Sequence, residues 1–202
     1  MTDCLLIVFV KNPALGRAKT RLAASIGDEK ALEVYKFLLE YTRTTTQATN
    51  ADKVVFYTDF VDKSDSFDST AFQKQLQIQD DDLGERMYNA FEYAFGQGYE
   101  RVLLIGSDCY ELSTDILNNA FDELKEHEFV IGPANDGGYY LVGMNRLEKK
   151  IFTHKTWSTA EVFGNTVQDF ENIEATYAIL PMLTDIDYLE DMSEDLKKRF
   201  NL

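Results

Sequence analysis

The chain has 202 residues, a formal net charge of −15, 45% hydrophobic residues and 27% charged residues. This composition is ordinary for a globular protein, and the length is enough for one good-sized domain with a substantial core. The negative charge argues against nucleic-acid binding, which needs a basic surface. It disfavours tight self-association at low salt, but it is compatible with a homodimer and with a small anionic ligand in one basic pocket.

Membrane-spanning, secreted and zinc-binding proteins are also disfavoured by pattern. The sequence has no run of about 18 apolar residues, so no membrane span is expected, and its N-terminus lacks a secretory signal pattern. Its two cysteines, Cys4 and Cys109, make neither a disulfide framework nor a zinc motif. We therefore expect a reduced, cytoplasmic protein.

Strand and helix patterns alternate along the chain. Strands are expected at the short apolar runs Cys4–Val10, Val54–Tyr57, Leu76–Ile78, Val102–Ile105, Phe129–Ile131, Tyr139–Val142 and 176–183. Helices are expected from about Lys19, at 28–48, at Leu83–Gly96, after Ser113, after Ser158–Glu161 and at Asp187–Arg199. This alternation predicts an α/β fold with a mostly parallel central sheet. No linker divides the chain, so residues 1–202 are expected to form a single domain.

The segment Phe9–Leu22 concentrates positive charge in an acidic protein. It follows the first expected strand and leads into a helix. Four cations and a glycine lie in this turn: Lys11, Gly16, Arg17, Lys19 and Arg21. Loop N–H groups and the positive start of a helix can hold a phosphate chain, and lysine and arginine neutralise the remaining charge. The alternative is that individual cations are solvated surface residues. The spacing matches neither a P-loop nor G-x-G-x-x-G.

Asp108 directly follows the expected strand Val102–Ile105. In open parallel sheets, ligands bind beyond the carboxyl ends of the strands, so this carboxylate should face the same crevice as the basic loop. A carboxylate beside phosphates needs a divalent cation between them, and Mg²⁺ typically uses one or two protein carboxylates. Asp108 is therefore the leading metal-ligand candidate, with a turn-forming aspartate as the alternative. Asp185 and Asp187 are both candidates for the second ligand, although Asp187 can instead cap the last helix with Glu190 at its third position.

The run Asp136-Gly137-Gly138 has two interpretations. Asp-Gly is a common hairpin-turn signal, which favours a structural role. The functional interpretation is that Gly137 and Gly138 let the backbone approach a substrate while Asp136 accepts hydrogen bonds from its hydroxyls. No pattern ties Cys109 to His127 or His154 as a nucleophile.

Six motifs in order carry a family resemblance over nearly the whole chain. They are Phe9–Leu22, Asp82–Met87, Ile105–Cys109, Gly132–Leu141, Trp157–Thr159 and Asp185–Asp191. With them the chain resembles a bacterial transferase family often encoded beside radical-SAM or selenoprotein domains, within the nucleotide-diphospho-sugar transferase superfamily. It is also similar to phospholactate guanylyltransferases and, more distantly, to molybdenum-cofactor guanylyltransferases. It departs from the family at Tyr110, where proline is usual, and at Tyr188, where relatives often carry threonine and proline.

The resemblance implies a GT-A fold, a Rossmann-like α/β/α sandwich whose mixed sheet has one reversed strand. It also implies a nucleoside phosphate in the crevice and Mg²⁺ or Mn²⁺ at Asp108, and it maps the family's last aspartate motif to Asp187. The residues expected to act in catalysis are Lys11, Lys19 and Asp108.

Three function hypotheses follow. The first is a nucleotidyltransferase, in which a small anionic acceptor attacks the α-phosphorus of a nucleoside triphosphate and pyrophosphate leaves; the basic loop favours it. The second is a glycosyltransferase using a nucleotide-sugar, although the Asp-x-Asp usual for that chemistry is replaced by Ser107-Asp108-Cys109. The third is a nucleotide-binding protein without turnover. The base, the sugar and the acceptor stay open.

Overall fold

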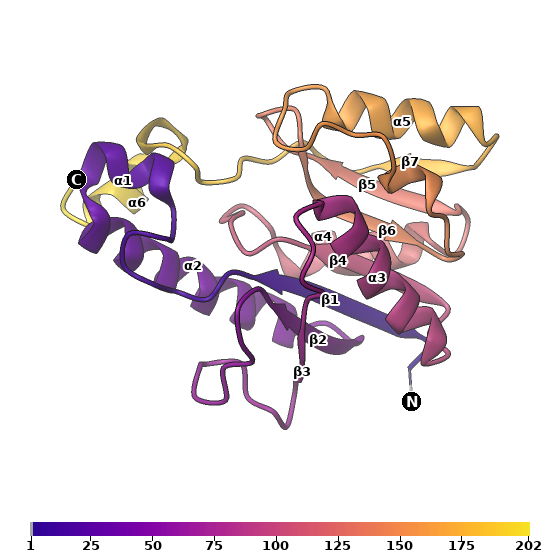
Figure 1. The fold of residues 1–202 in the computed structure, drawn as a ribbon, viewed down its shortest axis with the longest axis horizontal. Coiled ribbons are helices and arrows are strands. Elements are labelled where there is room, and N and C mark those ends of the chain that lie inside the picture. Colours follow the sequence, from indigo (N-terminus) through magenta and orange to yellow (C-terminus); the bar gives the residue numbers. More distant parts are fainter. Residues whose placement is uncertain (1) are drawn as a thin grey trace.

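A seven-stranded sheet forms the centre of the computed structural model, which describes residues 2–202 (Figure 1). Its strands are β1 (Cys4–Val10), β2 (Asp52–Tyr57), β3 (Gln73–Leu76), β4 (Arg101–Ile105), β5 (Phe129–Pro133), β6 (Tyr139–Met144) and β7 (Tyr177–Ile179). Their order across the sheet is β3-β2-β1-β4-β6-β5-β7. Strand β6 is antiparallel to both neighbours, and the other pairings are parallel. The predicted mostly parallel, mixed α/β sheet with one reversed strand is confirmed.

Helices cover both faces of this sheet. The α-helices are α1 (Thr20–Ile26), α2 (Asp28–Gln47), α3 (Leu83–Gly96), α4 (Thr114–Glu123), α5 (Val162–Asn172) and α6 (Glu194–Arg199), with short 3₁₀ helices η1 (Lys150–Phe152) and η2 (Leu189–Asp191). Helices α2 and α4 pack on one face, and α3 and α5 pack on the other. Within residues 2–202, no helix is long and apolar enough to cross a membrane.

Strand β1 shows why this sheet is covered on both sides. Leu6 and Val8 join the core beneath α2 and α4, whereas Leu5 and Ile7 join the core beneath α3 and α5. Successive side chains of a strand point to opposite faces, so a strand buried on both sides becomes a continuous apolar run. A third cluster packs α1, α2 and α6 together at one end of the molecule (Figure 1). This cluster brings the chain's last segment to the basic loop.

Several element boundaries differ from the predicted ones. The short strand expected at Leu76–Ile78 lies at Gln73–Leu76, and the last strand covers only Tyr177–Ile179. The long helix starts after Gly27, whose positive φ of 83° breaks it from α1, so Asp28 lies inside the helix. These segments are polar or short, and their limits depend on pairing with a neighbouring strand.

Residues Ser158–Glu161 have the Ser-x-x-Glu pattern of a capping box, but no capping box forms there. Helix α5 begins at Val162, and its preceding residue Glu161 makes no side-chain cap. Ser158 instead has a left-handed backbone with φ 62°. Beside it, the indole of Trp157 donates a hydrogen bond to Asp82 at 2.9 Å, which ties this loop to the start of α3. A tertiary contact therefore replaces the local capping signal.

Asp82→Ala is expected to lower the free energy of unfolding by about 1–2 kcal/mol. The Asp82 carboxylate caps α3 by accepting hydrogen bonds from the backbone N–H groups of Gly84 and Glu85, and it also accepts from Trp157. Urea unfolding followed by circular dichroism measures this loss, and a shift in tryptophan emission reports release of the indole. The neighbouring exposed Asp81→Ala is the control. Equal stability of both variants would contradict the capping role.

Candidate active site

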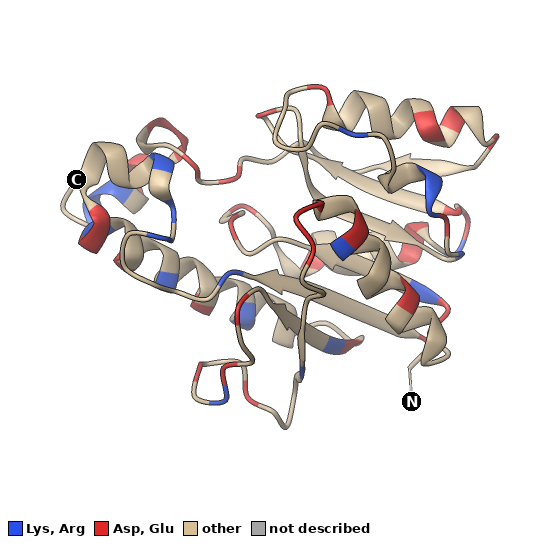
Figure 2. Ribbon diagram, viewed as in Figure 1, with Lys and Arg blue, Asp and Glu red and all other residues tan. Residues whose placement is uncertain are grey.

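A cleft of about 510 Å³ lies beyond the carboxyl ends of β1 and β4. Its walls come from the loop after β1, the end of β4, the β5–β6 hairpin, the loop before α5 and the segment after β7. This volume falls in the range of small-molecule sites. Most predicted site residues line it: Lys11, Lys19, Arg21, Asp108, Asp136, Gly138 and Asp187. Figure 2 shows the basic positions grouped where β1 ends and α1 begins.

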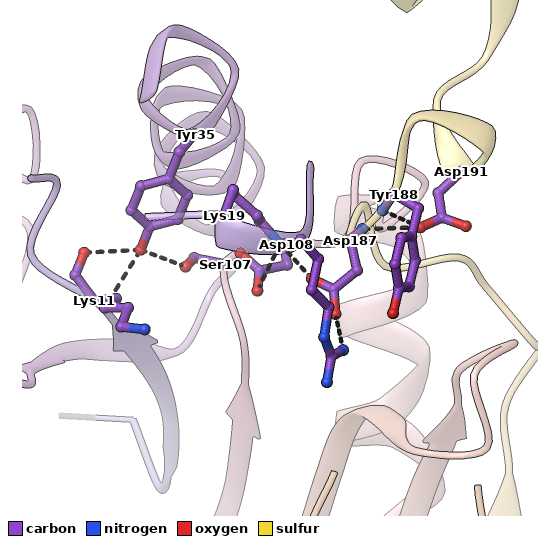
Figure 3. Close-up of polar contacts among 9 residues, drawn as sticks. Lys11, Lys19, Tyr35, Ser107, Asp108, Asp187, Tyr188 and Asp191 are labelled. Atoms are coloured by element: carbon purple, nitrogen blue, oxygen red, sulfur yellow. Dashed lines mark hydrogen bonds and ion pairs between the residues drawn. The ribbon is translucent and has the colours of Figure 1, made fainter. Parts of the chain in front are cut away.

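Lys19 bridges two aspartates from distant parts of the chain (Figure 3). Its Nζ lies 3.0 Å from Asp108 Oδ2 and 3.1 Å from Asp187 Oδ1, and its side chain is only 4% exposed. Arg21 Nη1 lies 2.8 Å from the other oxygen of Asp187. The structure thus brings four predicted residues into one alternating chain of charges.

The charges of this cluster support one another. Burial opposes the ammonium form of Lys19, but the two aspartates outweigh it and raise the pKa of Lys19. Burial likewise favours the neutral acid at Asp187, but Lys19 and Arg21 outweigh it and lower the pKa of Asp187. Both groups are therefore charged at neutral pH.

Asp187 does not cap the last helix. The backbone N–H groups of Asp187 and Tyr188 donate to the Asp191 carboxylate at 2.9 and 2.6 Å. Ser193 caps α6 instead, through a hydrogen bond from the N–H of Leu196. The expected helix over Asp187–Arg199 is therefore divided, and the Asp187 carboxylate is left to face the cleft.

Asp185 lies on the same wall of the cleft and is crowded by other acids. Burial, followed by the charge of Asp108, raises the pKa of Asp185 to about 7; Asp136 and Asp187 add to this and Lys19 opposes it. Carboxylates gathered in this way are stabilised by a cation.

The cleft contains carboxylate oxygens of the kind that bind Mg²⁺. No group of three or more His, Cys, Asp or Glu residues within 2–202 has the arrangement of a metal site. Mg²⁺ needs fewer protein ligands, because one or two carboxylates, phosphate oxygens and water complete its shell. Asp108 and Asp187 supply hard oxygen donors that already face one shared cation, the Lys19 ammonium. The residues present therefore fit a divalent ion that binds together with phosphates.

Lys11 is positioned through its backbone. Its carbonyl accepts a hydrogen bond from the Tyr35 hydroxyl at 2.8 Å, and its N–H donates to the same oxygen at 3.0 Å (Figure 3). The hydroxyl also lies 3.4 Å from Ser107 Oγ. Burial raises the pKa of Tyr35, so this hydroxyl stays protonated. Tyr35 therefore joins the ends of β1 and β4, a role that its place on a helical face did not reveal.

Gly16 and Arg17 shape the basic loop outside the cleft. Gly16 has φ 70°, which glycine adopts without a steric cost. The Arg17 side chain is 67% exposed, and its Nη2 lies 3.4 Å from Asp59. Neither residue is among those lining the cleft. The basic loop therefore delivers some of its cations to the cleft and leaves one on the outer surface.

Of the two glycines in the β5–β6 hairpin, Gly138 lines the cleft and Gly137 does not. The N–H of Gly138 donates to Asp136 Oδ1 at 2.8 Å, which closes the turn, and both residues line the cleft. Gly137 packs against protein backbone instead, and a Cβ built on it would lie 2.2 Å from the carbonyl oxygen of Ala160. The missing side chain of Gly137 therefore lets the hairpin pack closely against the backbone just before α5, and not against a ligand.

Arg86 lines the cleft and was missed by the sequence analysis. Its Nη1 donates to Gln77 Oε1 at 3.1 Å, and the buried Gln77 is held in turn by the carbonyl of Phe56. The buried Nε of Arg86 has no hydrogen-bond partner within residues 2–202. A cation near the start of a helix is unfavourable beside the helix dipole. This unfavourable placement is the feature of the sequence that could have pointed to Arg86 as a functional residue.

Trp157 and Tyr139 form an aromatic wall of the cleft. Their rings meet edge to face, with centroids 6.5 Å apart. Met87 and Leu83 of α3 extend the apolar surface. The cleft thus has a charged end near β1 and β4 and, near α3, an aromatic and apolar wall beside the Arg86 guanidinium. This combination suits a ligand with a phosphate chain and a ring.

The fold is shared with solved structures of distantly similar sequence. An inositol-1-phosphate CTP transferase from T. maritima has a TM-score of 0.55 at 14% identity, covering 98% of this chain and 94% of that one. A 4-diphosphocytidyl-2C-methyl-D-erythritol synthase from Anaerococcus prevotii has a TM-score of 0.56 at 11% identity, covering 94% and 92%. At such low identity, these likenesses show a common fold alone.

A relative at higher sequence identity and a family model show which family the chain belongs to. A protein from Desulfovibrio desulfuricans G20, provisionally named a nucleotide-diphospho-sugar transferase, has a TM-score of 0.85 at 30% identity, covering 93% of this chain and 84% of that one. No curated protein sequence matches the chain. The model of the family "Uncharacterized protein conserved in bacteria" (DUF2064) matches residues 41–159, more than half of the chain. The chain therefore belongs to the DUF2064 family.

Proposed function

We propose that the protein is a metal-dependent nucleotidyltransferase, which joins a nucleoside triphosphate to a small anionic acceptor and releases pyrophosphate. The observation that carries this proposal is the cluster of Lys19, Arg21, Asp108 and Asp187 at the carboxyl ends of β1 and β4. Alternating cations and carboxylates are the groups needed to hold a phosphate chain together with Mg²⁺ or Mn²⁺. The fold shared with an inositol-1-phosphate CTP transferase supports the same class.

The proposed reaction is a single displacement at phosphorus. An acceptor oxygen attacks the α-phosphorus, the bond from that phosphorus to the oxygen bridging the β-phosphate breaks, and pyrophosphate leaves with the electron pair. Lys11, Lys19 and Arg21 would bind the phosphates and stabilise the charge of the transition state. Asp108 and Asp187 would hold the divalent ion, which supplies neutralisation of the phosphate oxygens when bound.

This chemistry does not require a histidine. An ionised acceptor oxygen needs no general base, and phosphoryl chemistry depends mainly on positioning and electrostatic stabilisation. Neither His127 nor His154 lines the cleft. The protonated Tyr35 hydroxyl would keep the backbone of Lys11 aligned with Ser107 beside Asp108.

The test combines ligand binding with product detection. Thermal unfolding is followed with ATP, CTP, GTP or UTP, each with and without Mg²⁺, and pyrophosphate release is then measured with sugar phosphates and inorganic phosphate as acceptors. We expect one triphosphate to stabilise the protein only with Mg²⁺, by about 2.7 kcal/mol at a hundred times its Kd. Pyrophosphate should appear with that triphosphate. No stabilisation and no pyrophosphate would contradict the proposal.

A glycosyltransferase is the second candidate, because the relative at 30% identity carries the name of a nucleotide-diphospho-sugar transferase. Asp136 on the cleft wall would then accept hydrogen bonds from sugar hydroxyls. Stabilisation by a nucleotide-sugar, with release of a nucleoside diphosphate and no pyrophosphate, would favour this candidate over the first.

Arg86→Gln is expected to weaken nucleotide binding by about tenfold to a hundredfold, as a charged hydrogen bond contributes roughly 1.5–3 kcal/mol. Within residues 2–202, the Arg86 side chain makes one hydrogen bond, through Nη1, and it lines the cleft, where its remaining Nη hydrogens can reach a ligand. Calorimetric titration with the triphosphate that stabilises the wild type measures the change. Arg43→Gln, which removes a surface ion pair with Glu40 on α2, is the matched control. Wild-type affinity in Arg86→Gln would exclude a contact to the ligand.

A further inference from the structure

We infer that Lys19 is a tethered counter-ion: in the free protein its ammonium takes the place between Asp108 and Asp187 that a divalent ion takes when a nucleotide binds. The metal would then bind together with the nucleotide rather than before it. This inference rests on the proposed function and adds an order of binding to it.

The first support is the geometry of the ammonium. A lysine ammonium has three N–H donors, and two of those of Lys19 reach the two aspartates that are proposed as metal ligands. The side chain is 4% exposed, so it lies inside the cluster rather than on its rim. A divalent ion held by Asp108 and Asp187 would lie about 2.0–2.1 Å from its oxygen ligands, against the two carboxylates that Lys19 contacts. The ion and the ammonium repel each other at such short range, so binding of the ion disfavours the Lys19 contacts.

The second support is the backbone of Lys19. The residue directly precedes α1 and has left-handed angles of φ 50° and ψ 48°. This conformation is unfavourable for a residue with a Cβ, and a cation at a helix start is also electrostatically unfavourable. No side-chain hydrogen bond caps α1 at this position. This backbone conformation places the ammonium against Asp108 and Asp187, and these two contacts offset the free-energy cost of the conformation.

The third support is the charge balance. Asp108 and Asp187 carry two negative charges, and Lys19 and Arg21 carry two positive charges, so the four residues together are neutral. Without a nucleotide, a divalent ion must compete with these two cations for the Asp108 and Asp187 carboxylates. A triphosphate supplies oxygens that attract Lys19 and Arg21, and both carboxylates are then available to the ion. The nucleotide thereby raises the metal affinity, and the metal raises the nucleotide affinity by the same factor.

The experiment is a titration with Mn²⁺, followed by electron paramagnetic resonance of the free ion, without nucleotide and with each of the four triphosphates. Wild-type protein is expected to bind Mn²⁺ weakly alone and, with one triphosphate, to remove more free Mn²⁺ than that triphosphate removes without protein. Lys19→Met should bind Mn²⁺ without nucleotide roughly tenfold or more tightly than wild type, within the usual range of coupling between sites. Lys19→Gln should show the same gain, so the test stands if either variant folds, as judged by circular dichroism.

Lys74→Met is the matched control, because Lys74 forms a largely buried ion pair with Asp65 away from the cleft. It should bind Mn²⁺ as wild type does. If wild-type protein binds Mn²⁺ with a triphosphate but the Lys19 variants gain no affinity without nucleotide, the inference is overturned and the proposed function stands. If no triphosphate promotes Mn²⁺ binding to the wild type, the proposed function itself is contradicted.

Discussion

Asp108→Asn is expected to reduce pyrophosphate release by about 100- to 1,000-fold, the loss found when one electrostatic contact to a transition state is removed. Asparagine keeps the size of the side chain and removes its charge. In the structure Asp108 lies three positions after the last residue of β4, and its Oδ2 contacts the Lys19 ammonium at 3.0 Å. The variant would lose the proposed metal ligand and one counter-charge of Lys19. The turnover number, with the Mg²⁺-dependent thermal shift, measures the effect.

The matched control is Asp122→Asn on α4. Asp122 is exposed, forms an i,i+3 pair with Lys125 and is not among the residues that line the cleft. Surface pairs of this kind contribute little, so its activity and stability should equal those of the wild type. Near-normal turnover of Asp108→Asn would show that the carboxylate takes no part in the reaction. A folded but inactive Asp108→Asn that also loses its Mg²⁺-dependent shift is the expected outcome.

Gly137→Ala is expected to destabilise the fold by about 3 kcal/mol or more, since it combines backbone strain with a backbone clash. Gly137 has φ 88°, a conformation that residues with a side chain rarely adopt. A Cβ there would lie 2.2 Å from the Ala160 carbonyl oxygen and 2.4 Å from its Cα. Backbone atoms cannot move aside as the end of a side chain can. Urea unfolding measures the difference in free energy.

Gly164→Ala on α5 provides the opposite control. A Cβ at Gly164 meets nothing within 4 Å, and the residue lies in a helix. Replacing glycine by alanine there should stabilise the protein by about 0.5–1 kcal/mol. Wild-type stability of Gly137→Ala together with weakened ligand binding would instead support the role at the substrate that the sequence predicted for Gly137.

The elements that could be predicted from the sequence depend on local patterns. Strands β1 and β4 are apolar runs followed by polar residues, because parallel strands buried on both faces have no polar side. Their carboxyl ends meet at one edge of the sheet, so the basic loop and Asp108 were predicted to share a crevice. The Asp136-Gly137 pair is likewise a local turn signal, and it lies in the hairpin that makes β6 antiparallel to β5.

The pairing inside the candidate site was decided by tertiary structure. Lys19 and Asp187 are 168 positions apart, and they meet because α1, α2 and α6 pack into one cluster. Arg17 has the same chemistry as Arg21, yet it pairs with Asp59 on the outer surface. Which way a loop side chain points depends on contacts with residues distant in the chain, and these leave no periodic signal.

By itself, the sequence determined the α/β class, the strands of the central sheet and the residue types available at its carboxyl edge. The tertiary structure alone decided that Lys19 joins Asp108 to Asp187, that Gly137 packs against the backbone before α5 and that Arg86 lines the cleft. The physical reason is range: burial patterns and turns act between near neighbours in the chain. A binding site is assembled from side chains that only the packing of whole helices against the sheet brings together.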